Sequence, residues 1–252
     1  MSAFNSHALA LRGLSKRFDR PVVDALDLDV RRGEIYALLG ANGAGKTTTL
    51  RMATGLLMPD AGSVHIFGVD LHAQPEAAKR PLAYLPDEPL LYGKLTALEY
   101  LVFMAGLWHM PAAPAAAAAD GLLALLGLAP HAHELTESYS RGMKQKLALA
   151  GALIHQPELI VLDEPLTGLD AHAARQVKDL LQRHTASGGT VVMTTHILEV
   201  AERMADRIGI LQHGRLIGEG SLEQLRTQAQ QHDASLEDVF LRLTESSHET
   251  AV

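Results

Sequence analysis

The segment GANGAGKT, residues 40–47, has the residue types that bind a polyphosphate. It fits the pattern G-x-x-x-x-G-K-[ST], in which glycines allow backbone N–H groups to surround phosphate oxygens. In this pattern the lysine, here Lys46, contacts the β- and γ-phosphates of a nucleotide, and the hydroxyl of the last residue, here Thr47, binds Mg²⁺. A glycine-rich turn that binds nothing would leave this lysine and this threonine without explanation. We therefore predict a nucleotide-binding site.

Two acidic residues directly follow a second apolar segment. The sequence LIVLDE places Asp163 and Glu164 after four apolar residues, and α/β proteins bind ligands at the carboxyl ends of parallel strands. Asp163 suits the Mg²⁺ shell, and Glu164 suits the activation of a water molecule. A solvated loop is the alternative, but two adjacent acids at the end of a core strand disfavour it. His196 ends a third apolar segment, where it can contact a γ-phosphate or the attacking water.

The segment SYSRGMKQKLALAGAL, residues 138–153, combines an apolar helical pattern with a cationic front. Ser140 suits the N-cap position, and Arg141, Lys144 and Lys146 follow with no acidic residue among them. A helix N-terminus attracts anions through its unpaired N–H groups. This helix is therefore predicted to face an anion that its own sequence neighbourhood does not provide.

Hydrophobic periodicity predicts the elements that must hold these segments. Residues 24–30 alternate as in a half-buried strand, and residues 34–39 form the continuous apolar run of a fully buried strand. Residues 96–129 are rich in Ala and Leu and predict helices, with the alanine tract 112–119 interpreted as a surface loop leading into a helix. Further strands are predicted at 63–71, 158–165 and 189–196, and further helices at about 45–57 and near 171–186. Residues 207–220 predict a hairpin that turns at His213-Gly214, and the polar tail contains an amphipathic stretch, SLEDVFLRL.

Composition excludes several classes of protein. The 252 residues are 47% hydrophobic, enough for one substantial core or a core with a smaller subdomain. A net charge of −7 argues against a protein that coats nucleic acid, and the lack of cysteine excludes disulfides and thiolate chemistry and fits a reducing compartment. The start, MSAFNSHALALRG, has no secretory-signal pattern, and no apolar run reaches the roughly 18–20 residues that span a bilayer. We expect no nucleic-acid partner and no membrane-spanning segment.

Six motifs in order resemble those of ATP-binding cassette (ABC) ATPases, the nucleotide-binding subunits of ABC transporters. One such motif alone would be a weak signal, but the six together cover nearly the whole chain. They are the phosphate loop (40–47), YLPDE (84–88), YSRGMKQ (139–145), LIVLDE (159–164), TGLD (167–170) and His196.

The resemblance implies an α/β fold of the P-loop NTPase class, with a RecA-like core, an antiparallel β subdomain and an inserted α-helical subdomain. Residues 1–86 and 156–220 would form the nucleotide-binding core, whose first part includes the antiparallel β subdomain. Residues 87–155 would form the helical subdomain with the signature motif. Residues 221–252 would form a short C-terminal tail.

The resemblance also implies an MgATP site with assigned residues. Phe18 lies where family members carry an aromatic residue that stacks on adenine, with a core phenylalanine as the alternative. The expected catalytic residues are Glu164, His196 and Lys46. The expected Mg²⁺ contacts are Thr47, Asp163 and Asp87. The expected nucleotide contacts are Phe18, Gly40, Asn42, Gly43, Ala44, Gly45, Lys46, Thr47, Thr48, Asp87, Ser140, Gly142 and Asp170.

The signature segment departs from the usual Leu-Ser-Gly-Gly-Gln of this family. Arg141 replaces the first glycine and Met143 replaces the glutamine, whereas Ser140 and Gly142, the residues expected to contact phosphate, remain. Arg141 either adds a cation near the phosphates or faces water.

Asp87 is the larger departure, because the family usually has glutamine at this position. A carboxylate can still meet Mg²⁺ as a hard oxygen ligand, but it cannot donate a hydrogen bond and it adds negative charge near the triphosphate. Glu88 would fill the role instead if the loop slipped by one residue.

By resemblance, the signature helix faces the γ-phosphate bound by a second ATPase subunit, with a homodimer favoured over pairing with a paralogue. ATP would then hold a head-to-tail dimer together, and hydrolysis would release it. The other expected partner is an integral-membrane permease, which would hold the protein at the cytoplasmic face of the membrane. SLEDVFLRL resembles the ending of cassettes that pair with exporter-type permeases.

The loop from Asp87 to Tyr100 is predicted to receive a cytoplasmic helix of the permease, through Leu90, Leu91 and Tyr92. The alternative is that these residues pack on the helical subdomain. A soluble ABC ATPase acting on ribosomes or DNA would carry a second cassette or a long coiled-coil insert, and neither is present. A regulatory GTPase would need an Asn-Lys-x-Asp motif, which is also absent.

Overall fold

The computed structural model of the protein describes residues 7–231 and 234–249. Residues 1–6 of the stretch MSAFNSHALALRG, and residues 232–233 and 250–252 of the expected C-terminal tail, lie outside the described residues.

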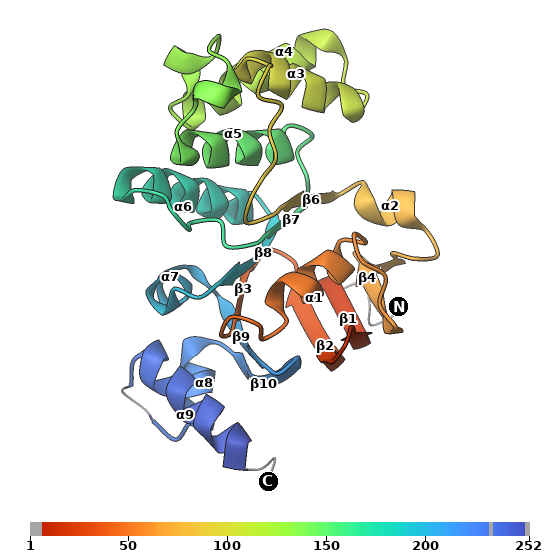
Figure 1. Ribbon diagram of the computed structural model, residues 1–252, viewed down its shortest axis with the longest axis vertical. Coiled ribbons are helices and arrows are strands. Elements are labelled where there is room, and N and C mark those ends of the chain that lie inside the picture. The colour runs from red at the N-terminus through yellow and green to blue at the C-terminus, as the bar shows by residue number, and fades with distance from the viewer. Residues whose placement is uncertain (1–6, 232–233, 250–252) are drawn as a thin grey trace.

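Two β-sheets organise the described residues (Figure 1). The larger is parallel except for one antiparallel pair at its β10 edge; its spatial order is β10 (Arg215–Gly220), β9 (Arg207–Gln212), β3 (Ile35–Leu39), β8 (Thr190–Thr195), β7 (Leu159–Leu162) and β6 (Leu82–Leu85). The smaller is antiparallel, in the order β2 (Pro21–Arg31), β1 (His7–Arg17), β4 (Ala61–Ile66) and β5 (Val69–Asp70).

Helices connect and cover the strands. Figure 1 shows α3, α4 and α5 gathered at one end of the molecule and α8 and α9 at the other, beyond β9 and β10. The bounds are α1 (Lys46–Ala53), α2 (Pro75–Lys79), α3 (Ala97–Leu107), α4 (Ala112–Leu125), α5 (Arg141–Leu153), α6 (Ala171–Ala186), α7 (Leu198–Met204), α8 (Leu222–Gln228) and α9 (Leu236–Glu249), with short 3₁₀ turns η2 (Ala129–His131) and η3 (Thr136–Ser138).

The strand β3 is buried along its whole length because both of its faces are covered. Successive side chains of a strand point to opposite faces. Accordingly Ile35, Ala37 and Leu39 belong to one hydrophobic cluster, and Tyr36 and Leu38 belong to the other. The continuous apolar run predicted this strand correctly, since a parallel strand covered on both sides needs no polar positions.

The expected single strand at 63–71 is wrong, because the chain reverses within it. Phe67 and Gly68 both have positive φ, 48° and 83°, and they join β4 to the short antiparallel strand β5. Two successive residues with positive φ are typical of a two-residue hairpin turn.

The alanine tract is also corrected, since residues 112–119 form the first turns of α4 and not a loop before it. Alanine has the highest helix propensity of all residues. Ala115, Ala119 and Leu123, spaced four apart, are the buried residues of this helix, so the tract provides a narrow face that packs closely.

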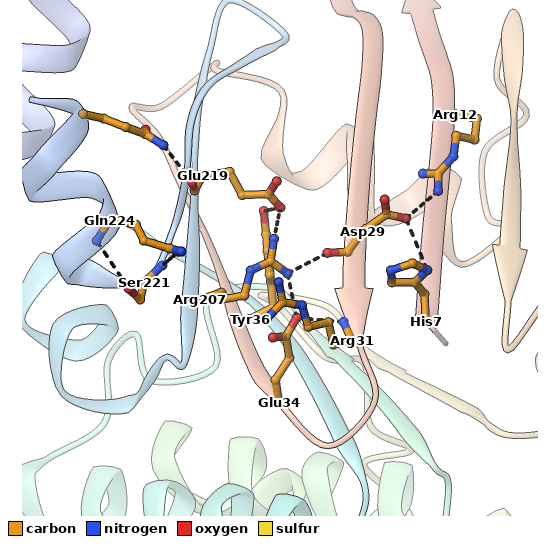
Figure 2. A network of polar contacts seen from close by, with 11 residues as sticks. His7, Arg12, Asp29, Arg31, Glu34, Tyr36, Arg207, Glu219, Ser221 and Gln224 are labelled. Carbon is orange, nitrogen blue, oxygen red and sulfur yellow. Dashed lines mark hydrogen bonds and ion pairs between the residues drawn. The ribbon is translucent and has the colours of Figure 1, made fainter. Parts of the chain in front are cut away.

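A network of charged and polar side chains joins the two sheets (Figure 2). Arg207 of β9 contacts Glu34 at 3.0 Å and Glu219 of β10 at 2.9 Å, and it donates to the carbonyl oxygen of Asp29 in β2 at 3.0 Å. The hydroxyl of Tyr36 donates to Glu219 at 2.9 Å. Burial, followed by the nearby Glu219 charge, raises the pKa of Tyr36 well above its usual value, which keeps the hydroxyl a donor.

We expect Tyr36→Phe to lower the free energy of unfolding by about 1.5–3 kcal/mol, the usual contribution of a hydrogen bond to a charged group. The ring, fully buried in the wild type, still packs after this change. Urea denaturation followed by circular dichroism measures the difference. Tyr92→Phe is the matched control, since the Tyr92 side chain is 57% exposed and should lose little. Equal effects of both variants would contradict a stabilising role for the network.

Candidate functional site

The phosphate loop connects the end of β3 to the start of α1, as the motif requires. Gly45 has φ of 108°, and a Cβ built there would lie 2.6 Å from the carbonyl oxygen of Val22. A Cβ on Gly40 would lie 2.5 Å from the carbonyl oxygen of Leu211. No side chain larger than hydrogen fits at these two glycines, so the tight loop depends on them.

The N-terminus of α1 is suited to a bound anion. Its N-cap residue, Gly45, makes no side-chain cap, and its first turn contains no acidic residue. The first N–H groups of a helix need partners from outside the helix, and the helix dipole favours negative charge at this end. The loop therefore fits the phosphates that the motif predicts.

A cavity of about 230 Å³ lies over this loop. Its wall includes Lys46, Thr47 and Thr48 from the loop and helix, with Asp87 and Glu164 from other segments. The ammonium of Lys46 is buried and donates to the carbonyl oxygen of Gly40 at 2.7 Å. These residues were predicted for one site, and the structure brings them to one cavity.

The Glu164 carboxylate lies close to two side chains, Lys46 at the start of α1 and His196 directly after β8. Its Oε1 is 3.9 Å from Nζ of Lys46, and its Oε2 is 2.8 Å from Nδ1 of His196. The backbone N–H of His196 also donates to Oε2, at 3.3 Å. Glu164 has φ of 50°, in the left-handed region, which is uncommon for a residue with a side chain and is concentrated at functional sites.

Thr194 of β8 is a functional residue that the sequence did not single out. Its hydroxyl donates to Oδ1 of Asp163 at 2.6 Å and accepts from the backbone N–H of Glu164 at 3.0 Å. Both Thr194 and Asp163 are buried. Thr194 therefore orients the two acids that end β7. Its only sequence signal is its place two residues before His196.

The expected metal contacts supply oxygen donors. Thr47 and Asp87 line the cavity, while Asp163 is buried beside it at the end of β7. Among the described residues no group of three His, Cys, Asp or Glu side chains could hold a metal ion alone. This donor set fits Mg²⁺, which is usually bound by one or two carboxylates together with substrate phosphates and waters.

Asp87 faces negative neighbours. Burial raises the pKa of its carboxyl, and the charges of Asp163 and Glu164 raise it further, whereas Arg141 opposes them. Asp87 lines the phosphate cavity and Glu88 does not, so the structure does not have the one-residue slip considered for Glu88.

Arg141 does more than face water. It lines a cavity of about 360 Å³ that also includes Asp87, Glu88 and Lys144. A Cβ built on Gly168 of the TGLD segment would lie 2.8 Å from Nε of Arg141, so the guanidinium packs directly against that glycine. Asp87 and Arg141, the two charged departures from the family pattern, thus have opposite charges and share one cavity.

Lys146 was wrongly grouped with the cations that face an anion. It is buried and donates to the carbonyl oxygen of Leu126 at 2.8 Å and to Oε1 of Gln176 at 3.2 Å. Burial lowers the pKa of its ammonium group. Lys146 therefore links α5 to α6 and to the end of α4.

Four predicted nucleotide contacts lie outside the phosphate loop and do not line its cavity. Phe18 is 56% exposed in the turn between β1 and β2, so the core alternative is wrong. Ser140 caps α5 by accepting from the N–H of Met143, and Asp170 caps α6 by accepting from that of Ala173. Gly142 lies in the first turn of α5. Within one chain, Gly40 and Ala44 belong to the loop itself, whereas these four residues lie on other segments.

The fold and the site together define a P-loop NTPase, with acids at the end of β7 beside a phosphate loop after β3. Residues 23–167 match the family model described as ABC transporter. The chain belongs to this family, as an ATP-binding subunit with ATP hydrolase activity. No helix among the described residues has the length and apolar character needed to cross a membrane.

Similar proteins agree with this assignment. The chain is 37% identical over 228 residues to the daunorubicin/doxorubicin resistance ATP-binding protein DrrA of Streptomyces peucetius, covering 90% of this chain and 69% of that protein. It is 38% identical over 220 residues to the Nod factor export ATP-binding protein I of Ralstonia nicotianae, covering 87% and 68%.

A solved structure of the ATP binding subunit of an ABC transporter has a TM-score of 0.88 and 34% identity, and the match covers 94% of this chain and 99% of that one. A nucleotide-free ATP-binding cassette with a TM-score of 0.79 is 20% identical and shows the fold alone. The expected fold class and ATPase assignment are confirmed.

The shared cavity predicts that Asp87 and Arg141 are energetically coupled. Asp87→Gln or Arg141→Gly alone leaves one charge unbalanced and should lower ATP turnover. The double variant should turn over ATP about two- to fivefold faster than the two single effects multiplied together would give. This range corresponds to about 0.5–1 kcal/mol of coupling between partly exposed charges. ATPase assays on all four proteins measure it.

Arg203→Ala is the control partner for this cycle, because Arg203 is an exposed cation on α7 that pairs with Glu199. Its effect should simply add to that of Asp87→Gln. If the turnover of the Asp87→Gln/Arg141→Gly double variant equals the value given by the two single effects multiplied together, Asp87 and Arg141 act independently.

Proposed function

We propose that this protein binds MgATP in the phosphate cavity and uses its hydrolysis, within a dimer of two copies, to drive a separate membrane permease that exports its substrate. The observation that carries this proposal is the position of the Glu164 carboxylate. It lies beside the phosphate loop between Lys46 and His196, where it can accept a proton from a water molecule that attacks the γ-phosphate.

Each site residue then has a role. Lys46 and the backbone N–H groups of Gly43, Ala44, Gly45, Lys46, Thr47 and Thr48 bind the phosphates, with Gly40 and Asn42 shaping the loop. Thr47, Asp163 and Asp87 hold Mg²⁺, which when bound would neutralise charge that develops on the transferring phosphate. Glu164 positions and deprotonates the water, and His196 keeps the Glu164 carboxylate in place. Phe18 stacks on the adenine.

The dimer is proposed from the exposed front of α5. Ser140 and Arg141 are exposed there, and the first turn contains no acidic residue. Ser140 and Gly142 of α5, together with Asp170 at the N-cap of α6, would contact the nucleotide held by a second copy. ATP bound between the copies would shift the equilibrium toward the dimer, because only the dimer makes both sets of contacts.

A permease partner is supported by an apolar surface that includes the segment after Asp87. Leu90 is 94% exposed and Tyr92 is 57% exposed, and the Tyr92 ring lies edge-on to Phe103 of α3 at 5.2 Å. Leu91 instead packs against the core, so the expectation that all three apolar residues face the partner is corrected. Exposed apolar clusters mark interaction sites.

The occupant we propose for this surface is a short cytoplasmic helix of the permease, which places the protein at the cytoplasmic face of the membrane. Export is proposed because the names of two relatives concern drug resistance and Nod factor export.

We also propose the division into a core of residues 1–86 and 156–220, a helical subdomain of residues 87–155 and a tail of residues 221–252.

Glu164→Gln tests the catalytic role. The amide keeps nearly the same shape but cannot take a proton, so turnover should fall by about 10²–10⁴-fold, the usual contribution of general base catalysis. ATP binding should persist, and a dimer stabilised by ATP should accumulate on size-exclusion chromatography. Turnover near that of the wild type would transfer the role to another group, and a monomer at saturating ATP would contradict the dimer.

The docking surface is tested by Leu90→Glu and Tyr92→Glu, which place charge on the exposed apolar residues. Co-purification with the permease should weaken at least tenfold, while ATPase activity of the isolated subunit stays within about twofold. Leu56→Glu is the matched control, since Leu56 is 63% exposed but lies between α1 and β4. Equal loss in the control, or unfolding of the Tyr92 variant, would show that this surface is not the specific contact.

A further inference from the structure

A second cavity adjoins the phosphate cavity, and the C-terminal helix forms one of its walls. It has a volume of about 460 Å³. The two cavities share the lining residues Val22, Ala41, Asn42 and Gly43. The remaining wall comes from Ala44 of the loop, from the end of the β1–β2 turn and the start of β2, from the end of β9 with the turn that follows, and from Phe240 and Thr244 of α9.

The helix α9 is fixed in this position by its own capping and by buried contacts. Ser235 and Asp238 exchange hydrogen bonds that start the helix, with Ser235 N–H donating to Asp238 at 3.1 Å and Asp238 N–H donating to Ser235 at 3.2 Å. Leu236 and Val239 are fully buried in the main core. The side chain of Phe240 is therefore held against the cavity by a well-anchored helix.

Two further contacts draw α9 toward the nucleotide side of the sheet. The side-chain amide of Gln212, at the end of β9, donates to the carbonyl oxygen of Thr244 at 3.2 Å. Gly218 of β10 allows close approach, since a Cβ there would lie 3.0 Å from Cδ1 of Leu243. Figure 1 shows α9 beside β10 at this end of the molecule.

The cavity has the size and chemistry of a nucleoside site. Its volume is within the range of about 300–1,000 Å³ for small-molecule pockets, which are mainly apolar with a few polar groups. The ring of Phe240 and the side chains of Pro21 and Val22 offer apolar surface, while Asn42 offers an amide group. A flat base needs this combination of an apolar face and hydrogen bonds at its edge.

Phe18 lines neither cavity, although Arg20 and Pro21 of the same turn line the larger one. Phe240 therefore gives this cavity a phenyl ring, which Phe18 in its present position does not.

We propose that Phe240 of the C-terminal helix contacts the nucleoside half of the bound nucleotide, which extends from the phosphate loop into this cavity. This inference rests on the proposed phosphate site, because the shared wall places a nucleoside here only when its phosphates lie in the loop. It makes α9 part of the nucleotide site, so that occupancy by a nucleotide stabilises the C-terminal helix.

The test compares ADP with inorganic pyrophosphate by titration calorimetry, since pyrophosphate has the phosphates of ADP without the nucleoside. Phe240→Ala should weaken ADP binding about tenfold, equal to about 1.4 kcal/mol, and leave pyrophosphate binding unchanged. Phe240→Leu, which keeps apolar volume but loses the flat ring, should show a smaller loss. Leu241→Ala is the control, since Leu241 is the next residue of α9 and is 51% exposed.

Hydrogen exchange supplies a second readout that does not depend on a variant. ADP should slow amide exchange in α9 of the wild-type protein, and pyrophosphate should not. Unchanged ADP affinity in Phe240→Ala, or equal losses for ADP and pyrophosphate, would overturn the inference. Lys46→Ala tests the phosphate site separately from the Phe240 contact. This variant should weaken the binding of both ADP and pyrophosphate, and if it weakens neither, the proposed function itself fails.

Discussion

The carboxylate of Glu164 lies between the Lys46 ammonium and the His196 ring, and three separate segments must meet for this to happen. Lys46 follows β3, Glu164 follows β7 and His196 follows β8. These strands are adjacent and parallel, in the order β3-β8-β7, so their carboxyl ends meet at one edge. The hydrophobic clusters on both faces of β3 stabilise this order, and the chemistry of the site depends on it.

Hydrogen bonds then refine what the strand order brings together. Thr194 reaches from β8 to both acids of β7, so the register between these strands is tied to the orientation of the site. Arg141 connects three segments in another way, by packing on Gly168 while it shares a cavity with Asp87. The charge of Arg141 at the front of α5 therefore already interacts with Asp87 of its own subunit. A second copy that approaches this helix meets a cation that is partly balanced.

The sequence predicted the parts of this fold that depend on local pattern. The apolar run of β3, the amphipathic α6 and the turn at His213-Gly214 each carry a signal within a few residues, and each was found where expected. The hairpin turn at Phe67-Gly68 was missed because a phenylalanine in the left-handed region is uncommon. The alanine tract was misassigned because its composition alone resembles low complexity.

The candidate site was predicted as far as motifs describe it, and the remainder depends on long-range contacts. Thr194 has no motif of its own, and its role follows only from its distance to Asp163. Phe240 is about 200 residues from the loop it adjoins, so no local pattern relates the two. The pairing of Asp87 with Arg141 likewise needs the fold, since each alone reads as an isolated departure.

The left-handed backbone of Glu164 sets a limit on how this protein can be made to resist heat. A residue with a side chain held at such a φ costs about 1–3 kcal/mol of folding free energy, and glycine would remove that cost. Laboratory selection for thermal resistance alone would therefore favour glycine at this position. The same exchange would delete the carboxylate at the centre of the site, so a selection scheme for this protein has to score turnover together with survival of heating.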